Sequence, residues 1–132
     1  MTRINCGIPP YKLTDKHLLA EHREIKRIPN CISKGRYSMK GQPNQFVLGT
    51  GHVKFFYDKL GYLLVRYNQL YEECVFRGFN IKQYNDAWDD IPNDFMGNYE
   101  PTKSDINLIQ SRIDERLKES GNYTNTRDDL NK

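Results

Sequence analysis

The sequence predicts an all-α fold: a compact single domain of three main helices with long irregular connections. Apolar residues recur three and four positions apart in three segments, at 14–28, 52–77 and 103–120, which is the period of an amphipathic helix. Glycine and proline interrupt the segments between them. A chain of 132 residues is long enough for one domain, which buries roughly two-thirds of its unfolded surface. We expect this domain to span residues 1–120, and residues 121–132 to form a polar, frayed tail.

The net charge of +3 is distributed unevenly along the chain. Residues 1–40 carry nine Lys and Arg against three Asp and Glu, residues 41–80 four against three, and residues 81–132 seven against eleven. This distribution predicts one electropositive face, for which an anionic polymer such as nucleic acid is the natural partner. A net +6 over the first forty residues is also compatible with ordinary scatter.

The three cysteines, Cys6, Cys31 and Cys74, are scattered and form no Cys-x-x-Cys pair. We therefore expect reduced thiols and a cytoplasmic location. No long apolar run or signal-peptide pattern is present, so neither membrane insertion nor secretion is expected. The three histidines and the cysteines lack metal-ligand spacing, and we expect no metal site and no cofactor.

Residues 1–13 are expected to form an extended arm, because Pro9 and Pro10 oppose a helix there. The first helix is expected from about Thr14, a suitable N-cap, to Ile28 or slightly beyond. Pro29 should kink or end it. The predicted inner face consists of Leu18, Leu19, His22 and Ile25.

Three charged residues of this helix lie three and four positions apart, Arg23, Glu24 and Arg27, and they should form one cluster. The usual interpretation of such a spacing is an ion-paired face in solvent. The alternative is an anion-facing site with one carboxylate held between two guanidinium groups. Periodicity alone does not decide between the two.

The segment 35–45 is predicted to be a basic, glycine-containing loop, suited equally to solvent and to a phosphate backbone. Gly49 and Gly51 lack the third glycine of a dinucleotide fingerprint, so we expect a tight turn before the second helix. His52 is predicted to pack or cap rather than to act as a ligand or base.

Residues 52–77 form the hydrophobic centre of the sequence and are predicted to be a buried helix. An unbroken helix of this length would measure about 39 Å, more than the ~30 Å of a small domain. Gly61 is therefore the predicted break or bend. Arg77 and Gly78 should end the helix.

Residues 79–101 are predicted to be a long irregular connection, held to the core by its aromatic residues and kept away from nucleic acid by its acidic ones. The third helix is expected over 103–120 with Thr102 as its cap. Arg112 and Arg116 project together from it, either toward an anion or into solvent ion pairs with acidic neighbours.

Three blocks of residues occur together in a specific order. They are Met1-Thr2-Arg3-Ile4-Asn5, then His17-Leu18-x-Ala20-Glu21-x-Arg23-Glu24-x-x-Arg27, then Phe46-x-Leu48-Gly49-x-Gly51-His52-Val53-x-Phe55-Phe56-Tyr57-Asp58-Lys59-Leu60. In these blocks, and more weakly to about residue 118, the chain resembles the phage pyrimidine-dimer DNA glycosylase and AP lyase family. This family is also known as the endonuclease V of thymine-dimer repair.

The resemblance implies a catalytic pair, Thr2 and Glu24. Met1 would be removed, and the exposed α-amine of Thr2 would attack the anomeric carbon of the damaged nucleotide and form an imine. Glu24 would stabilise cationic character on the sugar and shuttle protons, including those of the β-elimination that nicks the strand. An α-amine has a reference pKa near 8, against about 10.4 for lysine, so more of it is free amine at neutral pH.

The resemblance also implies the partner, double-stranded DNA containing a lesion, and a monomeric, metal-independent enzyme. His17 matches a histidine that lines the site. The positions that would hold phosphates or shape the DNA are Arg3, Arg23, Arg27, Lys34, Arg112 and Arg116.

Two other functions stay open. The family enzyme ends in an aromatic and basic cluster, whereas residues 121–132 contain one aromatic residue and little positive charge. The target is therefore either a pyrimidine dimer, the leading choice, or a different modified base attacked by a glycosylase or nuclease. The remaining alternative is a non-catalytic binding protein on the same scaffold.

Overall fold

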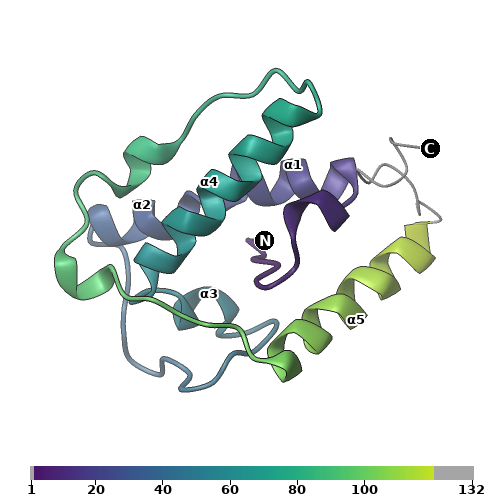
Figure 1. Ribbon diagram of the computed structural model, residues 1–132. Helices are drawn as coiled ribbons and strands as arrows, with labels where there is room; N and C mark the ends of the chain where they lie inside the picture. The colour runs from purple at the N-terminus through teal and green to yellow at the C-terminus, as the bar shows by residue number, and fades with distance from the viewer. Residues whose placement is uncertain (1, 121–132) are drawn as a thin grey trace.

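The computed structural model describes residues 2–120, and every regular element within them is helical (Figure 1). The only β-type pairing in that range is an isolated bridge between Lys59 and Met96. The all-α prediction is confirmed, because the three longest helices fall in the three predicted segments. The α-helices are α1 (Asp15–Glu24), α2 (Arg27–Ser33), α3 (His52–Phe55), α4 (Leu60–Phe76) and α5 (Lys103–Ser120), and the 3-10 helices are η1 (Pro10–Lys12), η2 (Asn85–Trp88) and η3 (Asn93–Phe95).

The first predicted helix is divided into α1 and α2. Its start is confirmed, since the Thr14 hydroxyl accepts a hydrogen bond from the His17 backbone N–H at 3.3 Å. The break lies one turn before Pro29, because proline has no N–H to donate to the carbonyl of Ile25 and its ring crowds that carbonyl. The Ile28 N–H bonds Ile25 instead, at 3.3 Å. Pro29 is then tolerated in the first turn of α2.

The second predicted helix is divided into α3 and α4, but the prediction that Gly61 makes the break was wrong. The break lies at 56–59, and Gly61 is inside α4. A Cβ at Gly61 would lie 2.7 Å from the Met96 carbonyl oxygen, so the glycine permits the 79–101 segment to approach the helix. The expected turn at Gly51 is confirmed, with φ of 92° just before α3.

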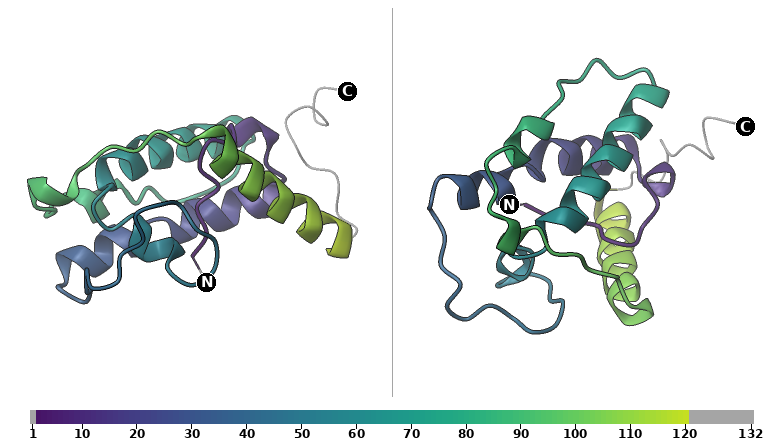
Figure 2. Two further views of the ribbon diagram at one scale, coloured as in Figure 1. Left: turned by 90° about the horizontal axis from the view of Figure 1, so that it is seen from below. Right: turned by 60° about the vertical axis from the view of Figure 1, so that its left-hand side comes forward.

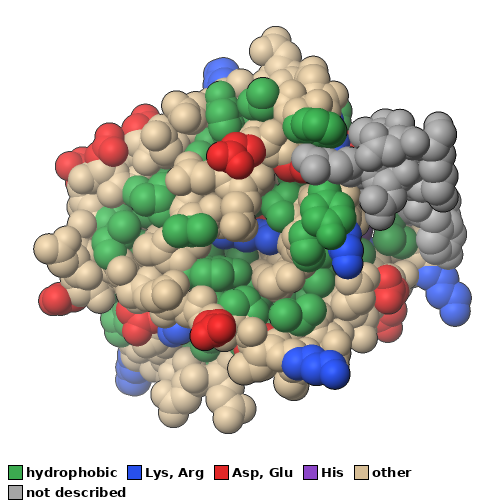
Figure 3. Space-filling view, viewed as in Figure 1, with side chains coloured by type: hydrophobic (Ala, Val, Ile, Leu, Met, Phe, Trp, Pro, Cys, Tyr) green, Lys and Arg blue, Asp and Glu red, His purple; other side chains and the backbone are tan. Residues whose placement is uncertain are grey.

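The core lies between α1 and α4, which pack on each other, with the 79–101 segment wrapped around them. Trp88 pins that segment, because its buried indole donates to the Leu60 carbonyl at 3.0 Å. The predicted role of the aromatic residues in this connection is thereby confirmed. Acidic side chains gather over η2, on the side of the view away from α5 (Figure 3). Asp86, Asp89 and Asp90 of this segment are exposed.

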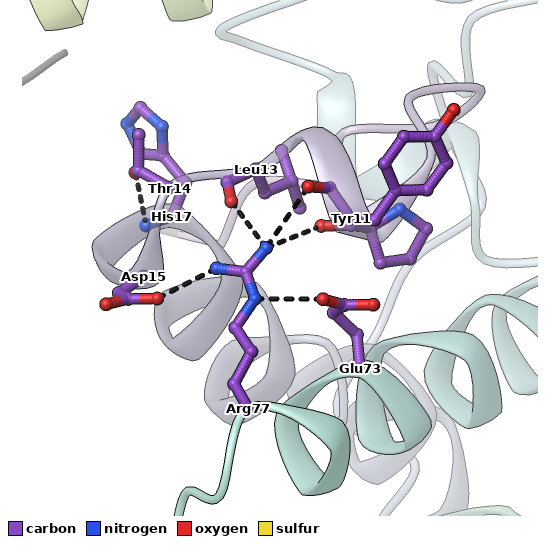
Figure 4. A network of polar contacts seen from close by, with 8 residues as sticks. Tyr11, Leu13, Thr14, Asp15, His17, Glu73 and Arg77 are labelled. Atoms are coloured by element: carbon purple, nitrogen blue, oxygen red, sulfur yellow. Dashed lines mark hydrogen bonds and ion pairs between the residues drawn. The ribbon is translucent and has the colours of Figure 1, made fainter. Parts of the chain in front are cut away.

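Arg77, at the C-terminal end of α4, joins that helix to the start of α1 (Figure 4). Its side chain is 1% exposed and makes ion pairs with Asp15 at 2.8 Å and with Glu73 at 2.9 Å. Its remaining nitrogen donates to backbone carbonyls of the arm, including that of Leu13 at 2.8 Å. One buried guanidinium therefore fixes where α1 begins.

The N-terminal arm lies between α5 and the α1–α4 pair, as the views in Figures 1 and 2 show. The arm contains no α-helix, as predicted, but it is not extended throughout, because it turns at residues 6–7 and forms η1 at Pro10–Lys12. A Cβ at Gly7 would clash with the Ile106 side chain, so α5 packs closely against the arm at this point. Thr102 caps α5 as predicted, since its hydroxyl accepts from the Asp105 N–H at 3.1 Å.

Candidate functional site

A cavity of about 200 Å³ opens where the arm, α1 and α5 meet. Residues from three distant parts of the chain therefore share one small volume. The cavity is lined by Arg3, Asn5, His17, Ala20, Glu21, Glu24, Arg112, Ile113 and Arg116.

Three guanidinium groups converge on this cavity, from Arg3 of the arm and from Arg112 and Arg116 of α5. Burial lowers the pKa of Arg112 to about 10, and the charges of Arg3 and Arg116 act in the same direction. The pKa of Arg3 is lowered as well, first by burial and then by Arg116, against the opposing effect of Glu24. The lowered pKa values show that these cations repel one another, and a bound anion would reduce that repulsion.

His17 projects into the same volume from the first turn of α1 and is half-buried. Its Nδ1 atom is buried and makes no hydrogen bond within the described chain. Burial lowers the pKa of His17, and the charges of Lys16, Arg116, Arg3 and Arg112 lower it further. The imidazole is therefore neutral at pH 7, and its Nδ1 atom has unused hydrogen-bonding capacity.

Glu24 provides the carboxylate at the end of α1. Its side chain is 13% exposed, and Oε2 lies 3.8 Å from a guanidinium nitrogen of Arg23, which is 60% exposed. Arg27 is also exposed but belongs to α2, beyond the helix break. Of the predicted cluster, only the contact between Arg23 and Glu24 lies within ion-pair distance in the described residues.

A buried network supports the cavity floor. The Glu21 carboxylate accepts two hydrogen bonds from Arg66 of α4, at 2.8 and 2.9 Å, and a third from the Asn5 side-chain amide at 2.9 Å. The Asn5 carbonyl oxygen in turn accepts from Arg112 at 3.3 Å. The side chains of Glu21 and Arg66 are 1% and 3% exposed. The network connects α4, α1, the arm and α5 in one chain of polar contacts.

The sequence-predicted site residues separate into a cavity group and a peripheral group. Arg3, His17, Glu24, Arg112 and Arg116 line the cavity together. Thr2 precedes a lining residue and is itself 9% exposed. Arg23, Arg27 and Lys34 are exposed and are not among the cavity's lining residues.

Sequence reasoning missed the buried members of the network. Glu21 and Arg66 had a detectable signal, because both fall on helix faces otherwise occupied by buried apolar residues, where an unpaired charge is costly. Asn5 had no such signal. His52 was predicted to pack, and it does, but its hydrogen bond to the backbone N–H of Ile4 at 3.0 Å was not foreseen.

Three further properties concern the described part of the chain. None of its helices combines the length and apolar character needed to cross a bilayer. Within residues 2–120, no three or more His, Cys, Asp and Glu side chains are grouped so as to hold a metal ion. The three cysteines are free thiols, as predicted.

The fold and the cavity define a helical protein with a cationic cavity that contains two carboxylates, Glu24 and the buried, paired Glu21. A family model described as pyrimidine dimer DNA glycosylase matches residues 1–86 of the 132. The chain belongs to this family, which confirms the predicted resemblance and implies a DNA substrate. The match covers the arm and α1 to α4, whereas α5, which carries Arg112 and Arg116, lies outside it.

Proposed function

We propose that the chain is a DNA glycosylase with AP lyase activity that excises a pyrimidine-dimer base through an imine with the α-amine of Thr2. The observation that carries the proposal is the cavity. It holds the Glu24 carboxylate among the guanidinium groups of Arg3, Arg112 and Arg116, while the other lining carboxylate, Glu21, is paired with Arg66. Arg3, the residue after Thr2, is part of the lining. Consecutive Cα atoms are about 3.8 Å apart, which supports an amine of Thr2 close to this volume.

The proposed reaction requires that Met1 be absent. The lone pair of the Thr2 amine attacks C1′ of the damaged nucleotide, the C1′–N glycosidic bond breaks, and its electron pair leaves with the base, which takes up a proton. The amine loses a proton, and its nitrogen lone pair then forms the C=N bond as the C1′–O4′ bond breaks. The electron pair of that bond goes to O4′, which takes up a proton, so the sugar ring opens and an imine joins nitrogen and C1′. Loss of a C2′ proton then breaks the C3′–O bond, and the electron pair leaves on the phosphate oxygen.

Glu24 is the proposed proton carrier in these steps. A carboxylate at this position stabilises the positive charge that develops on the sugar. It also accepts protons released in one step and donates them in a later one. Arg3, Arg112 and Arg116 hold the phosphates that flank the reacting nucleotide. Every step balances without a metal or cofactor, so chelation with EDTA should leave the activity unchanged.

The proposed target is a pyrimidine dimer in double-stranded DNA, and the family match supports this choice. The tail at 121–132, on which the alternative of another modified base rested, lies outside the described residues. Cleavage of irradiated, abasic and otherwise modified duplexes, compared side by side, separates these targets. The monomeric state proposed for the protein is tested by its mass in solution.

Borohydride trapping tests the proposal directly. Hydride reduces the imine to a stable amine, so the protein should become covalently attached to irradiated or abasic duplex DNA. Intact-mass measurement should show Met1 absent. A protein without Met1 that traps neither DNA would contradict the proposal. A retained Met1 would instead favour a non-catalytic binding protein on this scaffold.

Substitution of Glu24 by glutamine should separate binding from chemistry. Glu24→Gln is expected to bind lesion DNA as the wild type does and to lose base release by at least about a hundredfold, the usual size of a proton-transfer contribution. Glu72→Gln, at an exposed position on α4, is the matched control and should retain activity. Normal base release by Glu24→Gln would show that the role proposed for this carboxylate is wrong.

A further inference from the structure

Thr2, Ile4, Asn5 and Cys6 of the N-terminal arm are buried, and three contacts hold this part of the arm to the elements around it. Asn5 binds Glu21 through its side chain, and Cys6 lies 3.9 Å from the Tyr99 hydroxyl. The contact nearest the chain end is made by the backbone of Ile4, whose N–H donates to Nε2 of His52 at 3.0 Å. Two residues span at most about 7 Å, so this bond restricts the position of the Thr2 amine.

His52 can accept this hydrogen bond only as the neutral tautomer that carries its proton on Nδ1. Its Nδ1 lies 2.9 Å from the Val47 carbonyl oxygen, which can only accept, so Nδ1 carries the proton and Nε2 has the free lone pair that Ile4 requires. The ring is 3% exposed and is held edge-on to Phe46 and Phe56, at centroid distances of 5.4 Å. The acceptor is therefore fixed in tautomer and in direction.

We propose that His52 is a positioning residue, which holds the Thr2 amine in the cavity by accepting the hydrogen bond of the Ile4 backbone. His52 touches no reacting atom in this role. It sets the arm so that Arg3 lies in the cavity beside Glu24, and it thereby sets the amine that precedes Arg3. This inference rests on the proposed function, because it assigns a role in the reaction of the Thr2 amine.

Two substitutions separate the two hydrogen bonds of the ring. The terminal amide of glutamine occupies the region of Nε2, so His52→Gln keeps an acceptor for Ile4. The shorter amide of asparagine occupies the region of Nδ1, so His52→Asn keeps the donor to Val47 and loses the Ile4 contact. Trp88→Phe is the matched control, because it removes a single buried hydrogen bond to a backbone group, the Leu60 carbonyl, outside the arm.

The first measurement is hydrogen exchange of the Ile4 amide in the free protein, and it does not depend on catalysis. The Ile4 amide should exchange faster in His52→Asn than in the wild type, His52→Gln or Trp88→Phe. The second measurement is the rate of borohydride trapping on abasic duplex at saturating DNA, with DNA affinity measured separately. His52→Asn should trap at least about tenfold more slowly with DNA affinity nearly unchanged, as expected when a reacting group is misplaced by about 1 Å.

The outcomes distinguish the inference from the function on which it rests. Trapping by His52→Gln near the wild-type rate, together with slow trapping by His52→Asn, supports the positioning role. A wild type that traps DNA, with His52→Asn equal to it, overturns the role of His52 alone. Equal losses in His52→Asn and Trp88→Phe also overturn it, because they would show a general effect of stability. A wild type that traps no DNA overturns the proposed function and this role together.

Discussion

Glu21 is a carboxylate at a position where the helical pattern of α1 places core residues. It is 1% exposed and is stabilised by two hydrogen bonds from Arg66 and one from Asn5. Glu21→Gln leaves the Arg66 charge buried without its counter-ion, and we expect it to lower the free energy of unfolding by about 3–5 kcal/mol. Urea unfolding measures this. Glu72→Gln, exposed on α4, should change the free energy by less than about 0.5 kcal/mol.

The free energy of unfolding that Glu21→Gln loses is attributed to the Arg66 charge left buried without a partner. A double substitution tests this attribution. Replacing Glu21 and Arg66 together by leucine and methionine removes both charges. The double variant should therefore be more stable than either single variant, since the desolvation penalty disappears with the pair. A double variant with the summed loss of the two singles would contradict this account of the network.

At the scale of the secondary structure, the sequence predicted where helices form better than where they divide. Thr14 and Thr102 are local signals, and both caps are present as expected. The break before α2 was predicted from Pro29, but its position was not. A proline disturbs the carbonyl four residues earlier, so the helix divides before Pro29 rather than at it. The break before α4 had no local signal that identified it.

Gly61 illustrates the difference between a local and a tertiary requirement. In an exposed helix interior, replacing glycine by alanine raises stability by up to about 1 kcal/mol. Here the new methyl would lie 2.7 Å from the Met96 carbonyl oxygen and 3.0 Å from that of Gly97. Both groups are backbone and yield little, so Gly61→Ala is expected to lower the melting temperature. A rise in melting temperature would show that the 79–101 segment is not held against α4.

The site could be predicted from the sequence only where a motif supplied it. The match of residue types located Arg3, His17 and Glu24, and the structure brings these three together. Arg112 and Arg116 were assigned through the same resemblance, although spacing on their helix fitted solvent ion pairs equally well. The side chains that hold these residues, such as Asn5, make contacts across the fold, up to 107 positions apart in the case of its bond with Arg112. Periodicity carries no information at that range.

For the whole molecule, the converging guanidinium groups predict how DNA binding depends on salt. Each phosphate that a cation neutralises contributes about −0.9 to the slope of log affinity against log salt. Arg116→Gln should reduce the steepness of that slope by about 1. Lys103→Gln, exposed at the opposite end of α5, is the control and should leave the slope unchanged. Equal slopes for the wild type and Arg116→Gln would exclude a phosphate at the Arg116 guanidinium.

The stability of the whole molecule should also depend on pH through its two most buried histidines. The pKa of His22 is lowered by burial and then by the charge of Lys26. Its ring stacks on Tyr67, whose hydroxyl lies 3.4 Å from Nε2. In this environment a proton on His22 is unfavourable.

The pKa of His52 is lowered chiefly by burial. Arg112 of α5 and Arg3 of the arm also lower it, whereas the hydrogen bond to Val47 and the Glu21 carboxylate of α1 oppose them. Protonation of Nε2 would in addition abolish the bond that this atom accepts from Ile4. The folded protein therefore keeps both histidines neutral to a lower pH than the unfolded chain does.

The sign of the pH effect follows from which state binds the proton first. As the pH falls through about 6.5, the unfolded chain protonates these histidines and the folded protein does not, so stability is lost. The loss is at most about 1.4 kcal/mol per pH unit for each histidine. Urea unfolding at about pH 7.5 and about pH 5.5 should show lower stability at the lower pH. His22→Phe keeps an aromatic ring but has no proton to bind, so its difference between the two conditions should be smaller. An unchanged difference in His22→Phe would mean that His22 titrates alike in the folded and unfolded chain.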